Sequence, residues 1–502
     1  MQRAHLVLDP TFCVGTLDRR LFGTFVEHMG RCVYTGIYEP DHPTANAEGF
    51  RGDVLELTRE VGATVVRYPG GNFVSAYRWE DGVGPLADRP RRIDPAWRSI
   101  EPNEVGLNEF AGWARAAGLE PMLAVNLGTR GITEACDLLE YSNIAGGTQL
   151  SDLRIAHGVK EPHEVRLWCL GNELDGPWQI GHRTAEEYGR LAAETASAMR
   201  RIDPDIELVA CGSSNSRMPT FGSWEATVLD HTYDVVDHVS LHAYYEEHAG
   251  DLASFLAAGV DMDRFIAAVV ATADHVGAKR RSRKQIGLCF DEWNVWHQHD
   301  HAGLANVALQ ESPRLQEDTF GVADAVVVGG LLITLLRHAD RVKIACQAQL
   351  ANVIGLIRTE PGGPAWRQSI FHPFALTARL ARGMVLRAEP TGPRHETAQF
   401  GDVDTVDATA TWDAETGALA LFAVNRHPDE PVMLEVSLAA FPAATTAAVI
   451  GVHDDDLRAA NSASEPARVV PRPSTAAIVN GRLHLDLPPA SWQAISITTE
   501  SH

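Results

Sequence analysis

Two glutamates in this sequence of 502 residues stand where carboxyl groups could perform acid–base and nucleophilic chemistry. Glu173 closes the apolar run VRLWCLGNE (165–173), and Glu292 lies near the end of the run IGLCFDEWN (286–294). Glycoside hydrolysis requires such a pair, because one carboxyl group protonates the leaving oxygen while the other attacks the anomeric carbon. The alternative is that each glutamate is a structural acid at a strand end, paired with an arginine.

Asp291 competes with Glu292 for the second of these roles. Successive side chains on a strand point to opposite faces, so alternation predicts that only one of the two neighbours faces the interior. Periodicity alone does not choose between them. Aromatic side chains near the same strand ends could stack on sugar rings or simply fill the core: Tyr68, Trp79, Trp178, Tyr244, Tyr245, Trp293 and Trp296.

Short apolar runs rich in β-branched residues would hold these glutamates in place. Helical stretches such as AEEYGRLAAETASAMRRI lie between consecutive apolar runs. Near-continuous apolar strands alternating with helices are typical of a parallel sheet covered on both faces, and eight such units predict a closed (β/α)8 TIM barrel. An open doubly wound sheet would instead gather polar strand ends at one switch point. The eight runs span residues 21–28, 63–72, 121–128, 165–173, 206–215, 235–245, 286–294 and 342–352.

Functional residues of such barrels come from the carboxyl ends of the strands. The predicted ends carry Glu27, Arg67, Asn72, Asn126, Asn172, Glu173, Asn215, His242, Tyr244, Glu292 and Gln349. After about residue 380 the pattern changes to alternating strands broken by Pro, Gly, Asn and Asp, which predicts an antiparallel, jelly-roll-like β-sandwich. We therefore expect a barrel over residues 15–380 and a sandwich over 381–502, joined by an N-terminal strand within 1–14.

Composition limits the partners and the cellular compartment. The chain has 43 Lys and Arg against 66 Asp and Glu, a net charge of −23, so nucleic acid is an unfavourable partner. No apolar stretch is long enough to cross a membrane, and no signal peptide is recognisable at the N-terminus. The seven cysteines are scattered and include no CxxC pair, which fits a reducing compartment. We expect a cytoplasmic protein.

The histidines do not suggest a catalytic metal. His238 and His242 are four residues apart on a strand, about 13 Å at roughly 3.3 Å per residue, which is too far for one ion. We expect no HxH, HExxH or CxxC pair to offer chelation, and the glycine-rich PGGNF (69–73) and GGLL (329–332) do not match a phosphate-binding loop. We therefore predict no metal and no cofactor.

Several motifs together resemble the α-L-arabinofuranosidases of glycoside hydrolase family 51. They are FGTFVEHMGRCVYTGIYEP, VRYPGGNFVSAYRWEDGVGP, CLGNELDGPWQIGH, LHAYY, DEWNVW and QLANVIG, and they cover the whole barrel. The resemblance implies a retaining, exo-acting glycosidase that releases terminal arabinofuranose. It also implies that the partners are arabinofuranoside oligosaccharides and that the protein is a homohexamer.

The resemblance also assigns roles to individual residues. Glu173 would be the general acid/base and Glu292 the nucleophile, which decides between Glu292 and Asp291. Asn172 would hold the 2-hydroxyl of the sugar. The other expected substrate-site residues are Glu27, Asn72, Tyr244 and Gln349 around the ring, Arg67 and His242 supporting the nucleophile, and Trp296 lining the site.

Three other functions are alternatives to this assignment. Another retaining barrel glycosidase, such as a xylosidase or endoglucanase, would share the chemistry. A non-catalytic sugar-binding module is a second alternative, although binding alone does not need paired glutamates at strand ends. A barrel metallohydrolase is the third, and the spacing of the histidines argues against it.

Overall fold

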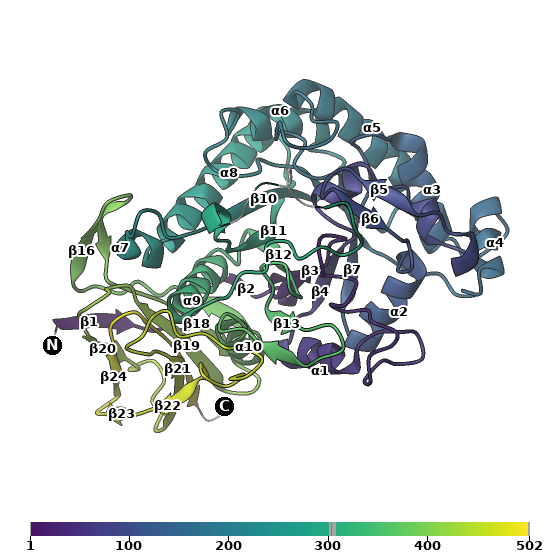
Figure 1. Cartoon of the computed structure of the whole chain (residues 1–502). Helices are drawn as coiled ribbons and strands as arrows, with labels where there is room; N and C mark the ends of the chain where they lie inside the picture. The colour runs from purple at the N-terminus through teal and green to yellow at the C-terminus, as the bar shows by residue number, and fades with distance from the viewer. Residues whose placement is uncertain (1, 301–302, 304–307, 500–502) are drawn as a thin grey trace.

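The computed structural model describes residues 2–300, 303 and 308–499 (Figure 1). Eight parallel strands close into a barrel in the order β10-β11-β12-β3-β4-β7-β8-β9. The barrel prediction is thereby confirmed, and each strand lies within one residue of the run that predicts it. The strands are β3 Gly23–Phe25, β4 Val65–Tyr68, β7 Glu120–Ala124, β8 Leu167–Leu170, β9 Glu207–Ala210, β10 His238–Tyr245, β11 Gly287–Val295 and β12 Val342–Ala348.

Helices surround the barrel, as the strand–helix alternation predicts. Most are amphipathic and bury one face on the strands. The ring contains α1 Gly52–Val61, α2 Leu107–Ala117, α3 Ile132–Asn143, α4 Gln149–Ala156, α5 Ala185–Ile202, α6 Ser223–Thr232, α7 Leu252–Leu256, α8 Gly259–Arg280, α9 Val322–Arg337 and α10 Phe371–Leu380.

Helix α9 differs from the others because it is apolar on every side. All of its residues from Val322 to Leu336 are buried, since the helix contacts barrel strands on one side and sandwich strands on the other. A glycine is required where it meets the sandwich, because a Cβ on Gly329 would lie 2.3 Å from the ring of Trp492. A helix that is hydrophobic all round is thus explained by burial between two layers.

The C-terminal part forms two packed sheets, drawn in green and yellow in Figure 1. Their inner faces share one apolar core. The larger sheet contains β2 Cys13–Thr16, β15 Met384–Leu386, β18 Val406–Asp413, β19 Ala418–Asn425, β25 Ser491–Thr498, β21 Ala447–Val452 and β22 Arg472–Ser474. The smaller sheet contains β1 Gln2–Val7, β20 Val432–Ser437, β24 Arg482–Leu487 and β23 Ala476–Val479.

The sandwich is antiparallel with one exception. Strand β1 runs parallel to β20, with Gln2 opposite Val432 and Val7 opposite Ser437. A parallel neighbour requires a long connection, and here the whole barrel lies between the two strands in sequence. The predicted antiparallel sandwich is thus confirmed, and the N-terminal strand joins it as a parallel edge strand.

Three hairpins stand outside these sheets. They are β5 Arg92–Asp94 with β6 Ser99–Glu101, β13 Ile357–Thr359 with β14 Ala365–Arg367, and β16 Arg394–Thr397 with β17 Gly401–Asp404. The turn of the third hairpin reaches the barrel, where the backbone N–H of Gln399 donates to the hydroxyl of Ser254. Among the described residues, no helix is both long and apolar enough to span a bilayer.

Candidate active site

Glu292 lies on β11 at the carboxyl end of the barrel, and both of its carboxylate oxygens are held by hydrogen bonds. Arg67, on β4, donates from a terminal nitrogen to Oε1 at 2.6 Å. The hydroxyl of Tyr244, on β10, donates to Oε2 at 2.7 Å. The side chain is buried, and these two donors fix its orientation.

Asp291 also faces this cluster, contrary to the prediction from alternation. Its Oδ2 lies 3.0 Å from Nε of Arg67, and its Oδ1 lies 3.3 Å from Nε2 of His242. The register of β11 shifts here against both neighbouring strands, as expected of a β-bulge, and an extra residue interrupts the alternation. Both neighbouring carboxyl groups can therefore contact Arg67.

Glu173 follows β8 and faces Glu292 across the mouth of the barrel. Its backbone has φ of +44°, a left-handed conformation that is uncommon for a residue other than glycine and is enriched at functional sites. Its Oε1 lies 2.8 Å from Nδ1 of His242, and its Oε2 accepts a hydrogen bond of 2.7 Å from the indole of Trp178. One carboxylate oxygen of Glu173 and one of Glu292 lie within 4.8 Å of each other.

Arg67 and His242 supply the positive charge of the site. Arg67 is fully buried and touches Asp291, Glu292 and the amide oxygen of Asn172, the last at 2.6 Å. Burial alone would lower the pKa of His242, but Glu292 and Asp291 raise it well above its usual value. Burial would raise the pKa of Asp291, yet Arg67 and His242 hold it below its usual range. Two cations therefore lie among the buried carboxyl groups.

Beside this pair lies a group of polar side chains suited to sugar hydroxyls. The amide of Gln349 donates to Oε2 of Glu27 at 3.3 Å, and the amide of Asn172 donates to Oδ1 of Asn72 at 3.4 Å. The glycines before Asn72 permit this approach, because a Cβ on Gly71 would lie 2.8 Å from Oε1 of Glu292. The PGGN sequence thus lets the backbone pass directly over the carboxylate.

Glu27 is a buried acid in this group with an unusual protonation state. Burial, reinforced by the charge of Glu292, raises its pKa to about 8. The backbone N–H of Phe73 and the indole of Trp97 donate to its Oε1 at 3.0 and 2.9 Å, but they do not offset the desolvation. This raised pKa favours the protonated form of Glu27 at neutral pH, in which its carboxyl group can act as a hydrogen-bond donor.

This protonation state predicts a pH-dependent difference in stability between the wild type and Glu27→Gln. Between the ordinary pKa of 4.5 and the folded value of about 8, the folded protein binds a proton that the unfolded chain has lost. The free energy of unfolding of the wild type, relative to the variant, should therefore fall as pH rises through this window, by at most about 1.4 kcal/mol per pH unit. Denaturant unfolding of both proteins across the window measures it, and identical pH profiles would contradict a raised pKa.

Trp296 borders the site by packing against the ring of Tyr244. Their ring centroids are 4.9 Å apart in an edge-to-face arrangement, and the Trp296 indole donates to Gln316 at 3.0 Å. Two of the predicted strand-end residues do not join the cluster. Asn126 turns back to accept from the backbone N–H groups of its own loop, and Asn215 accepts from the backbone N–H of Arg217.

Two tryptophans contribute to the site in ways the sequence analysis did not recognise. Trp97 holds Glu27, and Trp178, whose side chain is 49% exposed, holds Glu173. In the sequence Trp178 is one of several aromatic side chains near strand ends, while Trp97 comes from a loop whose path no local pattern reveals. A tryptophan five residues after a strand-end glutamate is the one signal in the sequence for such a contact.

Comparisons with known proteins point to a single family. One family model, the α-L-arabinofuranosidase C-terminal domain, matches residues 291–491, and another, the α-L-arabinofuranosidase 1 domain, matches 57–255. An intracellular exo-α-(1→5)-L-arabinofuranosidase of Streptomyces lividans is 57% identical over 499 residues, covering 99% of this chain and 75% of that protein. AbfB of Bifidobacterium longum is a family 51 α-L-arabinofuranosidase of solved structure. It matches this chain with a TM-score of 0.95 at 47% identity, and the match covers 99% of this chain and 100% of the AbfB chain.

The chain belongs to the α-L-arabinofuranosidases of glycoside hydrolase family 51. Another relative in this family, an exo-α-(1→6)-L-arabinofuranosidase of Bifidobacterium longum, is 50% identical over 512 residues, covering 99% of this chain and 98% of that protein. Relatives with similar sequence identity to this chain are thus named for different linkages, (1→5) in one case and (1→6) in the other. The family assignment removes the metallohydrolase and the sugar-binding module from the alternatives.

Proposed function

We propose that this family 51 member is a retaining, exo-acting α-L-arabinofuranosidase, which releases terminal non-reducing arabinofuranosyl residues from arabinosides and arabino-oligosaccharides. The observation that carries the proposal is the approach of Glu173 and Glu292, whose nearest oxygens lie within 4.8 Å. Retaining glycosidases hold their carboxyl groups about 5–5.5 Å apart, whereas inverting ones leave about 6.5–9.5 Å for a water molecule.

In the first step Glu292 acts as the nucleophile. Arg67 and Tyr244 orient its carboxylate, which attacks the anomeric carbon and forms a covalent glycosyl-enzyme. Glu173 gives its proton to the departing glycosidic oxygen. His242, a cation placed between the two glutamates, stabilises the negative charge of Glu292 before attack and that of Glu173 once it has given up its proton.

In the second step the roles of the carboxyl groups change. Glu173, now ionised, removes a proton from water, and the water oxygen displaces Glu292 from the anomeric carbon. Two inversions give L-arabinose with its original configuration. Glu27, Asn72, Asn172 and Gln349 hold the ring hydroxyls throughout, and Trp296 with Tyr244 forms one wall. Apart from the attacking water, these steps use only side chains of the protein.

A panel of aryl glycosides tests the sugar specificity directly. We expect release of the phenol from the α-L-arabinofuranoside to exceed that from the xylopyranoside or glucopyranoside by several orders of magnitude in kcat/KM. The reason is that the buried polar groups around Glu27 would be left unpaired by a ring of another shape. Faster turnover of either pyranoside would place the protein among the other retaining barrel glycosidases.

We further propose that the protein is a cytoplasmic homohexamer. Each chain would consist of a barrel over residues 15–380 and a sandwich over residues 381–502, which the N-terminal strand within 1–14 completes. Several relatives are named intracellular, and all seven cysteines are free thiols, consistent with a reducing compartment. Light scattering on the purified protein measures the oligomeric state. A mass of one or two chains would contradict the hexamer.

A further inference from the structure

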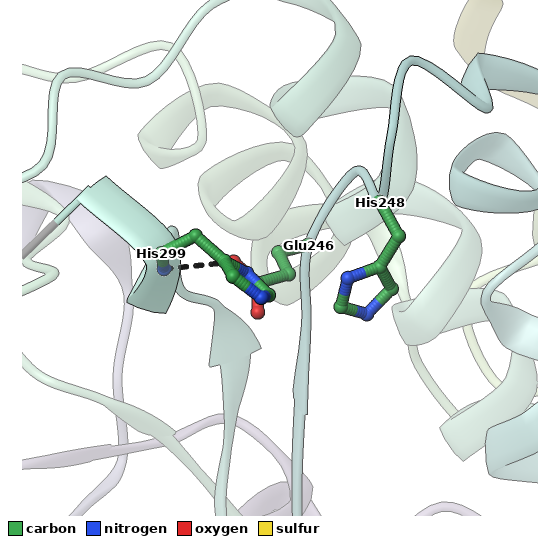
Figure 2. A group of neighbouring side chains, drawn as sticks. All are labelled: Glu246, His248 and His299. Atoms are coloured by element: carbon green, nitrogen blue, oxygen red, sulfur yellow. Dashed lines mark hydrogen bonds and ion pairs between the residues drawn. The ribbon is translucent and has the colours of Figure 1, made fainter.

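A second group of ligand-type side chains lies beside the active site but outside it. Glu246 and His248 follow β10 directly, and His299 belongs to a 3-10 turn (Gln298–Asp300) that follows β11. Figure 2 shows the three side chains reaching toward a common space from these two segments, with Glu246 and His299 in contact and the ring of His248 facing them. The mechanism proposed above uses none of them.

The distances within this group are those of a site that needs only a small contraction to bind a cation. Nδ1 of His299 lies 2.8 Å from Oε2 of Glu246, and the rings of His248 and His299 are 5.3 Å apart at their centroids. One ligand atom from each residue lies within 4.8 Å of the others. Tetrahedral zinc with bonds of about 2.0–2.1 Å needs ligand atoms roughly 3.4 Å apart, which side-chain rotations can supply.

Burial and charge also suit a cation. The Glu246 side chain is 11% exposed and its ion pair within the described chain is with a histidine, not with a lysine or arginine. The His299 side chain is 73% exposed, so the space between the ligands is open to solvent. Two imidazoles and one carboxylate form the set that zinc sites with an open position use, and water would fill the remaining position.

We propose that Glu246, His248 and His299 form a binding site for a zinc-class divalent cation that ties the segment after β10 to the segment after β11. The two segments already meet, because the backbone N–H of Trp296 donates to the carbonyl of Tyr245 at 2.9 Å. A bound cation would brace the wall formed by Tyr244 and Trp296 without touching the reacting carboxyl groups. Its role is structural, so hydrolysis itself would not require it.

The group Glu173, His242 and Glu292 also brings three such ligand atoms within 4.8 Å, and the experiment must separate the two. In that group both ring nitrogens of His242 already face carboxylates, at 2.8 Å from Glu173 and 3.3 Å from Asp291. A cation bound there would block catalysis. A cation bound at Glu246 would not.

Zinc binding to the full-length protein, stripped with EDTA and then freed of it, tests the proposal. We expect titration calorimetry to show one equivalent that His248→Ala and His299→Ala each weaken at least about tenfold, since even residues behind a ligand change affinity by that much. His231→Ala is the matched control, because His231 also pairs with a glutamate, Glu186, at 2.9 Å but has no third ligand in the described chain. It should bind zinc like the wild type.

Activity and cobalt absorption complete the test. The metal-free wild type and His248→Ala should hydrolyse an aryl arabinofuranoside at rates within about twofold of each other. Cobalt(II) should give the visible absorption of a four-coordinate site in the wild type and lose it in His248→Ala. Equal zinc binding by the wild type, His248→Ala and His299→Ala, or no binding by the wild type, would overturn the proposal, as would restoration of hydrolysis by zinc alone.

Discussion

Replacing Glu292 with alanine is expected to abolish turnover of every arabinofuranoside, activated or not, with a loss in kcat of at least about 10⁴-fold. No leaving group, however good, replaces the missing nucleophile. The hydrogen bonds from Arg67 and Tyr244 show that the carboxylate is held in one orientation, so water entering the cavity left by the side chain would not reproduce it. Steady-state hydrolysis of an activated aryl arabinofuranoside measures the loss.

Glu60→Ala provides the matched control for this variant. Glu60 is also a glutamate paired with an arginine, Arg367, but it lies on helix α1 on the protein surface. It should keep wild-type activity, and the circular dichroism of both variants should match that of the wild type. A folded Glu292→Ala protein that retains more than about a hundredth of the activity would contradict the assignment of the nucleophile.

Replacing Glu173 with alanine should produce a loss that depends on the leaving group. General acid catalysis is typically worth about 10²–10⁴-fold, and its value grows with the basicity of the departing oxygen. An arabinofuranoside of a strongly acidic phenol should therefore still form the glycosyl-enzyme at a substantial rate, whereas arabino-oligosaccharides should scarcely react. Rapid release of one equivalent of phenol, followed by slow turnover, is the expected time course.

Azide distinguishes the role of Glu173 further. Azide needs no deprotonation, so it should restore turnover of the activated substrate by Glu173→Ala. Two inversions would give the α-configured arabinofuranosyl azide, whereas any azide product formed by Glu292→Ala would result from one displacement and be β-configured. Equal losses for activated and unactivated substrates, with no rescue by azide, would contradict the acid/base assignment.

The barrel and the proximity of Glu173 to Glu292 could be predicted because both depend on local patterns. Eight apolar runs alternate with helices, and in a closed parallel barrel the carboxyl ends of all strands meet at one mouth, so Glu173 and Glu292 had to lie near each other. The same logic placed Arg67, His242 and Tyr244 correctly at this mouth.

The errors and omissions arise where geometry departs from regular strands. Alternation excluded one of Asp291 and Glu292, but the register shift in β11 brings both to Arg67. The parallel pairing of β1 depends on a partner more than four hundred residues away, which no local pattern shows. The pairing of His299 with Glu246 likewise depends on two loops. The expectation that no HxH pair is present was wrong, because His297-Gln298-His299 has that spacing, which can chelate metals.

The anomeric configuration of the first sugar released tests the central claim most directly. Proton NMR of an arabinofuranoside hydrolysed by the wild-type protein, recorded before mutarotation equilibrates the product, identifies that anomer. Carboxyl oxygens within 4.8 Å leave no room for a water between Glu292 and the sugar, so two displacements should occur and α-L-arabinofuranose should appear first. Initial accumulation of the β-anomer would mean a single displacement by water and would contradict Glu292 as the nucleophile.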